Sequence, residues 1–419
     1  MRFYFESYGC TMNHGESKIM QDMLRKEGHT IVSDLKNSDA LVLVTCTVIE
    51  TTELRMMRRL QTFSQTKKPV VVAGCMASVQ KEQILDVNPN AIIFPPQSLG
   101  DIGKLIKELS KRKPISMKKM DVAKTEIKKT ADTIIPISSG CLGSCTYCIT
   151  RIARGELRSC PPEILIDSMK KALTEGYKEI RLSSQDTAAY GADIDFNLPK
   201  LLKKIESLDG DFKVRVGMMN PENVIPILSD LIDAYKNQRI FKFLHLPVQS
   251  GSNKILEKMG RGYTINDFFN VVDGFRRYFP HITISTDVIV GFPQETEEDF
   301  NQTVKLIKKL KPDILNITRF SPRPKTPAMK MDNKIPSRIA KDRSRELTKI
   351  HMDISTKINR KFVGRKERIL ITEHGKNNTM MGRTDAYKPV ILSEKVKLCD
   401  FVDVDITEAK EIYLKGTVL

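Results

Sequence analysis

The chain has 419 residues, 40% hydrophobic and 28% charged, which is enough apolar sequence for the cores of two to four domains. Its 68 basic and 51 acidic residues give a net charge of +17, which suits either a polyanionic partner such as RNA or a solvated lysine-rich surface. No apolar run has the length of a membrane span, and the start MRFYFESYGC lacks the plan of a signal peptide. We therefore expect a cytoplasmic protein with no membrane partner.

Residues 1–112 alternate short apolar runs with helical patterns. The runs are FYFES, ALVLVT, PVVVAG and AIIFP, at 3–7, 40–45, 69–74 and 91–95, and the helical patterns lie near 15–27, 51–64 and 78–86. Continuous runs rich in Val and Ile are typical of buried parallel strands. This part of the chain predicts an open parallel α/β sheet.

The composition changes between residues 101 and 131, where ten basic residues stand against four acidic ones. A helix is expected to end near Lys113, and we interpret 113–131 as a basic linker. A solvated connector is the simplest role for it, although its charge would also help to bind RNA.

Strand–helix alternation returns in residues 132–355. Six candidate strands lie at 133–138, 179–184, 213–218, 241–246, 282–290 and 314–320. Six such units predict a partial (β/α)6 barrel, with a larger open sheet as the alternative, and active residues just past the strand ends. After a basic helix at 334–361, residues 360–419 predict a small all-β barrel, a class that often holds nucleic acid.

The segment Cys141-Leu-Gly-Ser-Cys145-Thr-Tyr-Cys148 follows the first of these strands. Full protein ligation of a cubane iron–sulfur cluster takes four cysteines, so three leave one iron open to a substrate or cofactor. A zinc site would need a fourth ligand at short spacing, which is absent, and a redox dithiol would not explain Cys141.

Three more cysteines follow the first three strands of the N-terminal sheet: Cys10, Cys46 and Cys75. Parallel strands bring their carboxyl ends to one edge, so these residues should converge there as a second three-cysteine cluster site. Buried structural cysteines are the alternative. Cys160 and Cys399 stand alone, and we expect no cluster role for either, nor for His14, which we assign to a helix start.

The C-x3-C-x2-C spacing resembles the signature of the radical S-adenosylmethionine (SAM) superfamily. There the amino and carboxylate groups of SAM chelate the open iron, and an electron from the cluster cleaves SAM to a 5′-deoxyadenosyl radical. Other segments resemble the SAM-contacting parts of such enzymes: SSQDT (183–187), HLPVQSGS (245–252) and DVIVGFPQE (287–295). The resemblance implies SAM contacts from Tyr147, Ser183, Gln185, Gln249, Asp287 and Gly291.

The whole chain resembles the radical SAM methylthiotransferases. The motifs are ESYGCTMN (6–13), VTCT (44–47), AGC (73–75), CLGSCTYC (141–148), ARGELRS (153–159) and MGRTDAYKPVIL (381–392), the last being similar to a TRAM RNA-binding barrel. The family implies two [4Fe-4S] clusters, SAM, a tRNA and an electron donor, and it says nothing of oligomeric state. It implies no catalytic residue beyond the cluster ligands Cys10, Cys46, Cys75, Cys141, Cys145 and Cys148.

The stretch SQDTAAYG (184–191) resembles the archaeal and eukaryotic branch that acts on N6-threonylcarbamoyladenosine next to the tRNA anticodon. Branches that act on isopentenyladenosine or on a ribosomal protein are the alternatives. Because the threonylcarbamoyl group carries a carboxylate, Arg151, Arg154 and Arg319 are candidate substrate clamps, with ordinary ion pairs as the competing role. Rival functions are a non-catalytic iron–sulfur redox sensor that binds RNA and a radical SAM enzyme of different chemistry.

Overall fold

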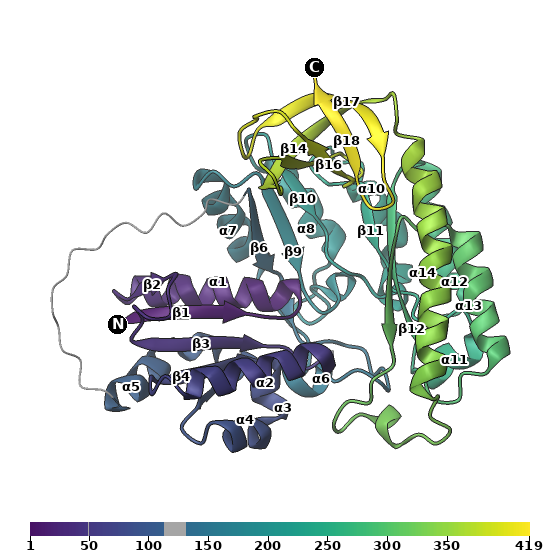
Figure 1. Ribbon diagram of the computed structural model, residues 1–419. Coiled ribbons are helices and arrows are strands. Elements are labelled where there is room, and N and C mark those ends of the chain that lie inside the picture. The colour runs from purple at the N-terminus through teal and green to yellow at the C-terminus, as the bar shows by residue number, and fades with distance from the viewer. Residues whose placement is uncertain (49, 113–130) are drawn as a thin grey trace.

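The structure, a computed structural model, describes residues 1–48, 50–112 and 131–419. The predicted basic linker therefore lies, apart from its last residue, outside the described residues. Three domains follow one another along the chain and meet around the centre of the molecule (Figure 1).

The N-terminal domain is a parallel sheet of order β2-β1-β3-β4-β5. Its strands are β1 (Arg2–Ser7), β2 (Thr30–Val32), β3 (Ala40–Thr45), β4 (Val70–Gly74) and β5 (Ile92–Phe94). Its helices are α1 (Thr11–Lys26), α2 (Glu50–Ser64), α3 (Cys75–Val79), α4 (Lys81–Val87) and α5 (Ile102–Arg112). Alternate residues of β3 face opposite layers: Val42 packs with α1 and α5, and Leu43 packs with α2 and α4. Burial on both faces explains the continuous apolar runs.

The central domain carries six parallel strands with helices on their outer face. The strands are β6 (Asp132–Pro136), β9 (Glu179–Ser183), β10 (Lys213–Arg215), β11 (Phe243–His245), β12 (Thr283–Val290) and β13 (Ile314–Arg319). They form two three-stranded sheets, β10-β9-β6 and β11-β12-β13, which meet where the Phe241 amide donates to the Val214 carbonyl at 3.0 Å. The predicted partial barrel is confirmed.

The helices of this domain cover the convex side of the barrel (Figure 1). They are α7 (Pro162–Thr174), α8 (Leu198–Lys204), α9 (Pro221–Val224), α10 (Leu228–Ala234), α11 (Asn253–Lys258), α12 (Ile265–Tyr278) and α13 (Glu297–Leu310). A two-stranded ribbon, β7 (Ser138–Ser139) with β8 (Arg158–Ser159), flanks the central cysteine loop and the short α6 (Thr150–Arg154).

The C-terminal domain is a closed barrel of order β14-β15-β16-β18-β17, as predicted. Its strands are β14 (Lys366–His374), β15 (Met380–Arg383), β16 (Pro389–Leu392), β17 (Phe401–Ala409) and β18 (Leu414–Val418). The long α14 (Ser337–Arg360) runs from the central domain to this barrel. Of the helices in the described part of the chain, none combines the length and apolarity that crossing a bilayer requires.

Candidate functional site: two cysteine groups at a domain interface

The central cysteines lie on a loop held by backbone and side-chain N–H groups. The Gly143 amide donates to Cys141 Sγ at 3.3 Å, and the Thr150 amide donates to Cys148 Sγ at 3.4 Å. A Cβ placed on Gly143 would lie 3.5 Å from Cys141 Sγ and 3.7 Å from Cys145 Sγ, so both sulfurs face the same point. N–H donors to sulfur are typical of iron–sulfur ligands, whose potentials they adjust.

The N-terminal cysteines converge at one edge of their sheet, as the sequence predicts. Cys10 caps α1 after β1, Cys46 follows β3, and Cys75 follows β4 as the first residue of α3. The chain before Cys10 runs so close to Cys46 that a Cβ on Gly9 would lie 2.5 Å from the Cys46 Cβ. Gly9 also has a φ of +101°, so both the space and the backbone conformation require glycine there.

Arg154 connects the two cysteine groups. It ends α6, six residues after Cys148, yet its side chain is buried in the N-terminal domain with only 1% of its surface exposed. Its Nε donates to Cys75 Sγ at 3.2 Å, and its two terminal nitrogens bond Glu16 at 2.5 and 2.9 Å. One of them also donates to Asn13 at 2.8 Å. A single guanidinium therefore joins the central loop to the N-terminal cysteine group.

This position does not fit the substrate-clamp role that we expected for Arg154. The guanidinium is closed to solvent and its charge is already matched by the Glu16 carboxylate. Asn13 and Glu16 themselves were not predicted; they follow Cys10 in the helix pattern, where nothing in a single sequence marks a polar side chain as buried.

The other two predicted clamp residues lie at the surface. Arg151 is 44% exposed on α6, 3.8 Å from Glu156, and its Nη1 approaches the Leu142 carbonyl at 3.4 Å. Arg319 is exposed at the end of β13. Their role in substrate binding stays a prediction.

The arrangement of the cysteine sulfurs in each group separates a site for a single metal ion from a site for an iron–sulfur cluster. In the described part of the chain, no three His, Cys, Asp or Glu side chains close around a single metal ion. A cubane cluster takes one cysteine per iron, so its three sulfurs surround a larger body and do not converge on one point. Three cysteines in each group, with N–H donors to several of the sulfurs, would suit such a cluster, with one iron left to a non-protein ligand.

Burial raises the pKa of thiols in both cysteine groups. Burial raises the pKa of Cys141 to about 11; the Gly143 amide opposes the rise, and Asp186 and the neighbouring thiols add to it. Burial raises the pKa of Cys75 to about 12; Arg154 opposes the rise, and Cys10 and Cys46 add to it. Because iron binds the thiolate, assembly of a cluster on such thiols would release protons.

Most of the predicted SAM contacts lie at the carboxyl ends of the barrel strands, while Tyr147 lies on the cysteine loop and Asp287 within β12. Gln185 accepts a hydrogen bond at 2.8 Å from the Gly140 amide, directly before the cysteine loop. Ser183 ends β9, and Gln249 follows β11 with a strained φ of +70°. Tyr147 packs edge-on against Phe292 at 6.4 Å between ring centroids.

Asp287 and Gly291 have structural partners of their own. Asp287 bonds His245 Nε2 at 3.0 Å and accepts a hydrogen bond from Asn316 Nδ2 at 2.6 Å. A Cβ on Gly291 would lie 2.7 Å from the Ala340 Cβ on α14, and its φ is +76°. Glycine at 291 is thus required by helix packing, a reason different from the close approach to SAM that we expected.

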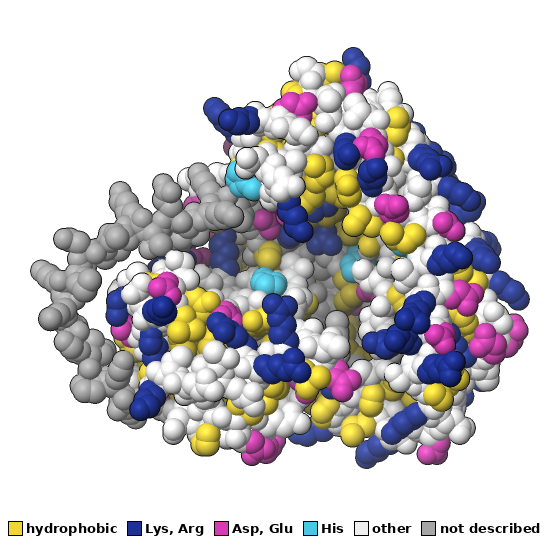
Figure 2. Space-filling model, in the orientation of Figure 1, with side chains coloured by type: hydrophobic (Ala, Val, Ile, Leu, Met, Phe, Trp, Pro, Cys, Tyr) yellow, Lys and Arg dark blue, Asp and Glu magenta, His cyan; other side chains and the backbone are white. Residues whose placement is uncertain are grey.

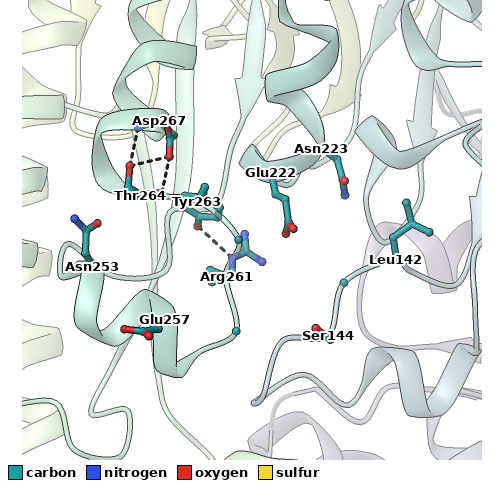
Figure 3. Close-up of a pocket in the computed structure, with 13 residues that line it drawn as sticks. Leu142, Ser144, Glu222, Asn223, Asn253, Glu257, Arg261, Tyr263, Thr264 and Asp267 are labelled. Carbon is teal, nitrogen blue, oxygen red and sulfur yellow. Dashed lines mark hydrogen bonds between the residues drawn. The ribbon is translucent and has the colours of Figure 1, made fainter.

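A pocket of about 610 Å³ opens beside the central cysteine loop. Arg261 and Tyr263 line one side, Glu222 and Asn223 lie opposite, and Ser144 of the cysteine loop borders it (Figure 3). Arg261 Nη1 reaches Cys145 Sγ at 3.4 Å, so the pocket wall contacts the second of the three central cysteines. Arg261 was not predicted, because Met-Gly-Arg-Gly-Tyr reads as an ordinary glycine turn.

The two remaining cysteines lie away from both groups. Cys160 packs against the main core, where its carbonyl accepts a hydrogen bond from the Tyr190 hydroxyl at 2.8 Å. Cys399 lies in the C-terminal barrel, and its amide donates to the Ile371 carbonyl at 3.0 Å. His14 is exposed in the first turn of α1.

Three family descriptions match the chain: "Uncharacterized protein family UPF0004" over residues 2–95, "Radical SAM superfamily" over 135–307 and "TRAM domain" over 360–419. A probable threonylcarbamoyladenosine tRNA methylthiotransferase of Pyrococcus horikoshii is 42% identical over 427 residues, covering 100% of both chains. One of Archaeoglobus fulgidus is 41% identical over 99% of this chain and 98% of its own. The Homo sapiens threonylcarbamoyladenosine tRNA methylthiotransferase is 32% identical over 99% of this chain and 73% of its own.

A solved radical SAM methyltransferase of Kitasatospora setae, with cobalamin and a [4Fe-4S] cluster bound, has a similar fold. Its TM-score is 0.59 at 12% identity, over 78% of this chain and 73% of that one. The partial barrel and its three-cysteine loop define a radical SAM protein. With its flanking domains and its full-length relatives, the chain belongs to the threonylcarbamoyladenosine tRNA methylthiotransferase family.

Proposed function

We propose that this protein converts N6-threonylcarbamoyladenosine next to the tRNA anticodon to its 2-methylthio derivative. The hydrogen at C2 of the adenine leaves, and a sulfur bearing a methyl group takes its place. One observation carries the proposal: two groups of three cysteines face a common interface, and Arg154 spans it from the loop of one group to a sulfur of the other.

The ligands of the two [4Fe-4S] clusters would be Cys141, Cys145 and Cys148 in the central domain and Cys10, Cys46 and Cys75 in the N-terminal domain. When bound, the clusters and SAM supply the radical, the sulfur and the methyl group, with electrons from an external donor. The protein's own residues position these groups: Gln185 holds the start of the central loop, and Gly143 and Thr150 donate N–H groups to its sulfurs.

The TRAM barrel and the basic balance of the chain support tRNA as the substrate carrier. A net charge of +17 favours contact with phosphates, which make the largest sequence-independent contribution to nucleic-acid binding. SAM would lie along the barrel edge near Tyr147, Ser183, Gln185, Gln249, Asp287 and Gly291.

The test is mass spectrometry of tRNA nucleosides. The full chain is reconstituted anaerobically with iron and sulfide, reduced, and incubated with SAM and tRNA that carries threonylcarbamoyladenosine. We expect a nucleoside heavier by one methylthio group. Cleavage of SAM with no new nucleoside would favour a radical SAM enzyme of other chemistry, and intact SAM in a reduced, cluster-loaded sample would favour the redox sensor.

The second cluster has its own test, Cys46→Ala. We expect iron to fall from about eight to about four atoms per chain, with SAM cleavage kept and methylthiolation lost. Cys160→Ala is the matched control, since this cysteine packs against the core away from both groups. Full product formation by Cys46→Ala would exclude a second cluster held by Cys46.

A further inference from the structure

The concave side of the partial barrel carries charged residues. Ile180 and Val214 on neighbouring strands pack into the core beneath the helices. Successive strand residues point to opposite faces, so Arg181 and Arg215 point away from those helices. Figure 2 shows this side as a hollow at the centre of the molecule, with basic and histidine side chains visible in it. Arg181 keeps 23% of its side chain exposed, consistent with a hollow that water enters.

The TRAM barrel closes the end of the hollow at the starts of the strands. The Tyr387 hydroxyl donates to Glu179 at 2.7 Å, and Lys213 pairs with Asp385 at 2.5 Å. The Arg215 guanidinium lies between two rings, 4.7 Å from the Phe243 centroid and 5.2 Å from that of Tyr387. We call Arg181, Arg215 and Arg383 the arginine floor.

Two members of the arginine floor have anionic partners and one does not. Arg181 pairs with Glu179 at 2.7 Å and lies 3.4 Å from Asp132, and Arg383 pairs with Glu373 at 3.2 Å. Among the described residues Arg215 has no ion pair, and its buried Nε has no hydrogen-bond partner. Guanidinium stays charged in proteins, and a buried charge is costly unless it is paired. Arg215 therefore has no carboxylate in ion-pair contact, although the charge of the nearby Glu179 acts on it.

The arginine floor lies one step below the SAM end of the barrel. Arg181 and Ser183, the last residue of β9, point to the same side of the sheet as successive side chains on that side. Arg215 lies beside Arg181 on the neighbouring parallel strand. One such step is about 7 Å along a strand. In adenine, C2 and the N6 substituent lie on opposite sides of N1. The bonds at C2 and C6 diverge, so a base that presents C2 to the central cysteine loop can extend its N6 arm away from that loop and toward the floor.

We propose that Arg215, supported by Arg181, binds the carboxylate of the substrate's N6-threonylcarbamoyl arm and so selects this nucleoside over ones with a neutral N6 group. The inference rests on the proposed function. Arginine can bind a carboxylate through two parallel N–H bonds, which also fix the orientation of the base. An apolar N6 arm would cover the half-buried Arg215 guanidinium and leave its charge unpaired, and this disfavours such a substrate.

The test compares two anticodon stem-loop RNAs, one with threonylcarbamoyladenosine and one with its uncharged carboxyl methyl amide. Binding to the cluster-loaded full chain and methylthiolation are both measured, for wild type, Arg215→Met and Arg215→Lys. Arg239→Met is the matched control, because Arg239 also packs over a ring, that of Phe212 at 5.0 Å, but on another part of the barrel. SAM cleavage without RNA and thermal unfolding report whether each variant is intact.

We expect wild type to prefer the acid by about tenfold to a hundredfold, as one charge-assisted contact provides. Arg215→Met should lose this preference, Arg215→Lys should keep part of it, and Arg239→Met should keep all of it. Wild-type methylthiolation of acid and amide at equal rates, or an unchanged preference in Arg215→Met, would overturn the inference and leave the proposed function standing. No methylthiolation of either RNA by wild type would instead remove the function on which the inference rests.

Discussion

Arg154 shows how one side chain can combine binding of a sulfur with the joining of two domains. Its burial is costly unless the charge is matched, and Glu16 supplies the match through both carboxylate oxygens. Asn13, which bonds Arg154, also donates to the carbonyls of Tyr8 and Thr45 beside Cys10 and Cys46. The same network therefore fixes all three N-terminal cysteine segments.

Arg154→Gln should weaken the N-terminal cluster site and leave the central one working. The change leaves Glu16 buried without its cation, which costs about 3–5 kcal/mol of unfolding free energy. We expect iron content and the electron paramagnetic resonance signal of the N-terminal cluster to decrease, while SAM cleavage continues.

Arg151→Gln on the same short helix is the control for Arg154→Gln, since Arg151 is 44% exposed and its nearest carboxylate is 3.8 Å away. It should leave iron content and both cluster signals unchanged. An Arg154→Gln protein with wild-type iron and spectra would show that the sulfur contact has no influence on the cluster.

The start of α13 shows how one residue stabilises both its own helix and a neighbouring loop. Asp299 forms a capping box with Thr296, and it also accepts a hydrogen bond from Ser252 Oγ at 2.7 Å. Burial raises its pKa, but the hydrogen bonds from Thr296 and Ser252 outweigh this and hold the pKa of Asp299 at about 2. The folded state therefore favours the charged carboxylate.

Asp299→Asn should lower stability by about 2 kcal/mol at pH 7, because asparagine keeps the cap but not the charge. A depressed folded-state pKa gives stability that is complete above the unfolded value, near 4, and is lost as the pH falls toward about 2. Urea unfolding between pH 7 and pH 3 should show the difference between the two proteins shrinking.

The capping box of α12, formed by Thr264 and Asp267, is the control for that of α13, because its hydrogen bonds are exposed to solvent. Asp267→Asn should cost less than Asp299→Asn at every pH. A loss for Asp299→Asn that stays constant down to pH 3 would mean that the charge is not what stabilises the fold.

Strong local patterns made most elements predictable from the sequence. The run ALVLVT (40–45) is β3 and the predicted basic helix at 334–361 is α14. A continuous apolar run indicates a strand buried on both faces, and apolar residues at helical spacing indicate a helix with one buried face. The edge strand β2 was missed, since its three residues gain strand structure only by pairing with β1. The predicted helix at 78–86 is divided at Gln80, where φ is −129°.

The cysteine groups could be predicted because each cysteine follows a strand, and strand ends share an edge. The role of Arg154 in joining the two domains could not be predicted, because its partners Glu16 and Asn13 lie 138 and 141 residues away in sequence. No local pattern gives the relation between two domains. The same holds for the pocket beside Arg261 and for the arginine floor, which the TRAM barrel completes from the other end of the chain.

At the scale of the whole molecule, a few buried ion pairs hold the outer domains to the barrel. Arg323 pairs with Glu53 of the N-terminal domain at 2.8 Å, and Lys388 of the TRAM barrel pairs with Asp313 at 2.6 Å. Both pairs are largely shielded from water, so each is sensitive to the loss of one partner. Domain docking, and with it the closure of the hollow, depends on them.

Lys388→Met should loosen the TRAM barrel from the central domain. Lys388 Nζ contacts Asp313 Oδ1, and it also donates to Asn359 at the end of α14 at 3.0 Å, so one ammonium group holds three elements. Removing it leaves the Asp313 carboxylate, 9% exposed, without its cation, and we expect a loss of about 3 kcal/mol. Thermal unfolding of the full chain measures it.

Two further variants separate charge burial from simple contact loss. Lys388→Met combined with Asp313→Asn leaves no buried charge and should recover most of the stability. Lys213→Met breaks a second ion pair of this interface, whose Asp385 side chain is 48% exposed, and should cost less than about 1 kcal/mol. Equal losses for Lys388→Met and Lys213→Met would show that the buried pair does not govern docking.

If docking also shapes the arginine floor, Lys388→Met should weaken binding of the acid stem-loop more than that of the amide, whereas Lys388→Met with Asp313→Asn should restore the preference.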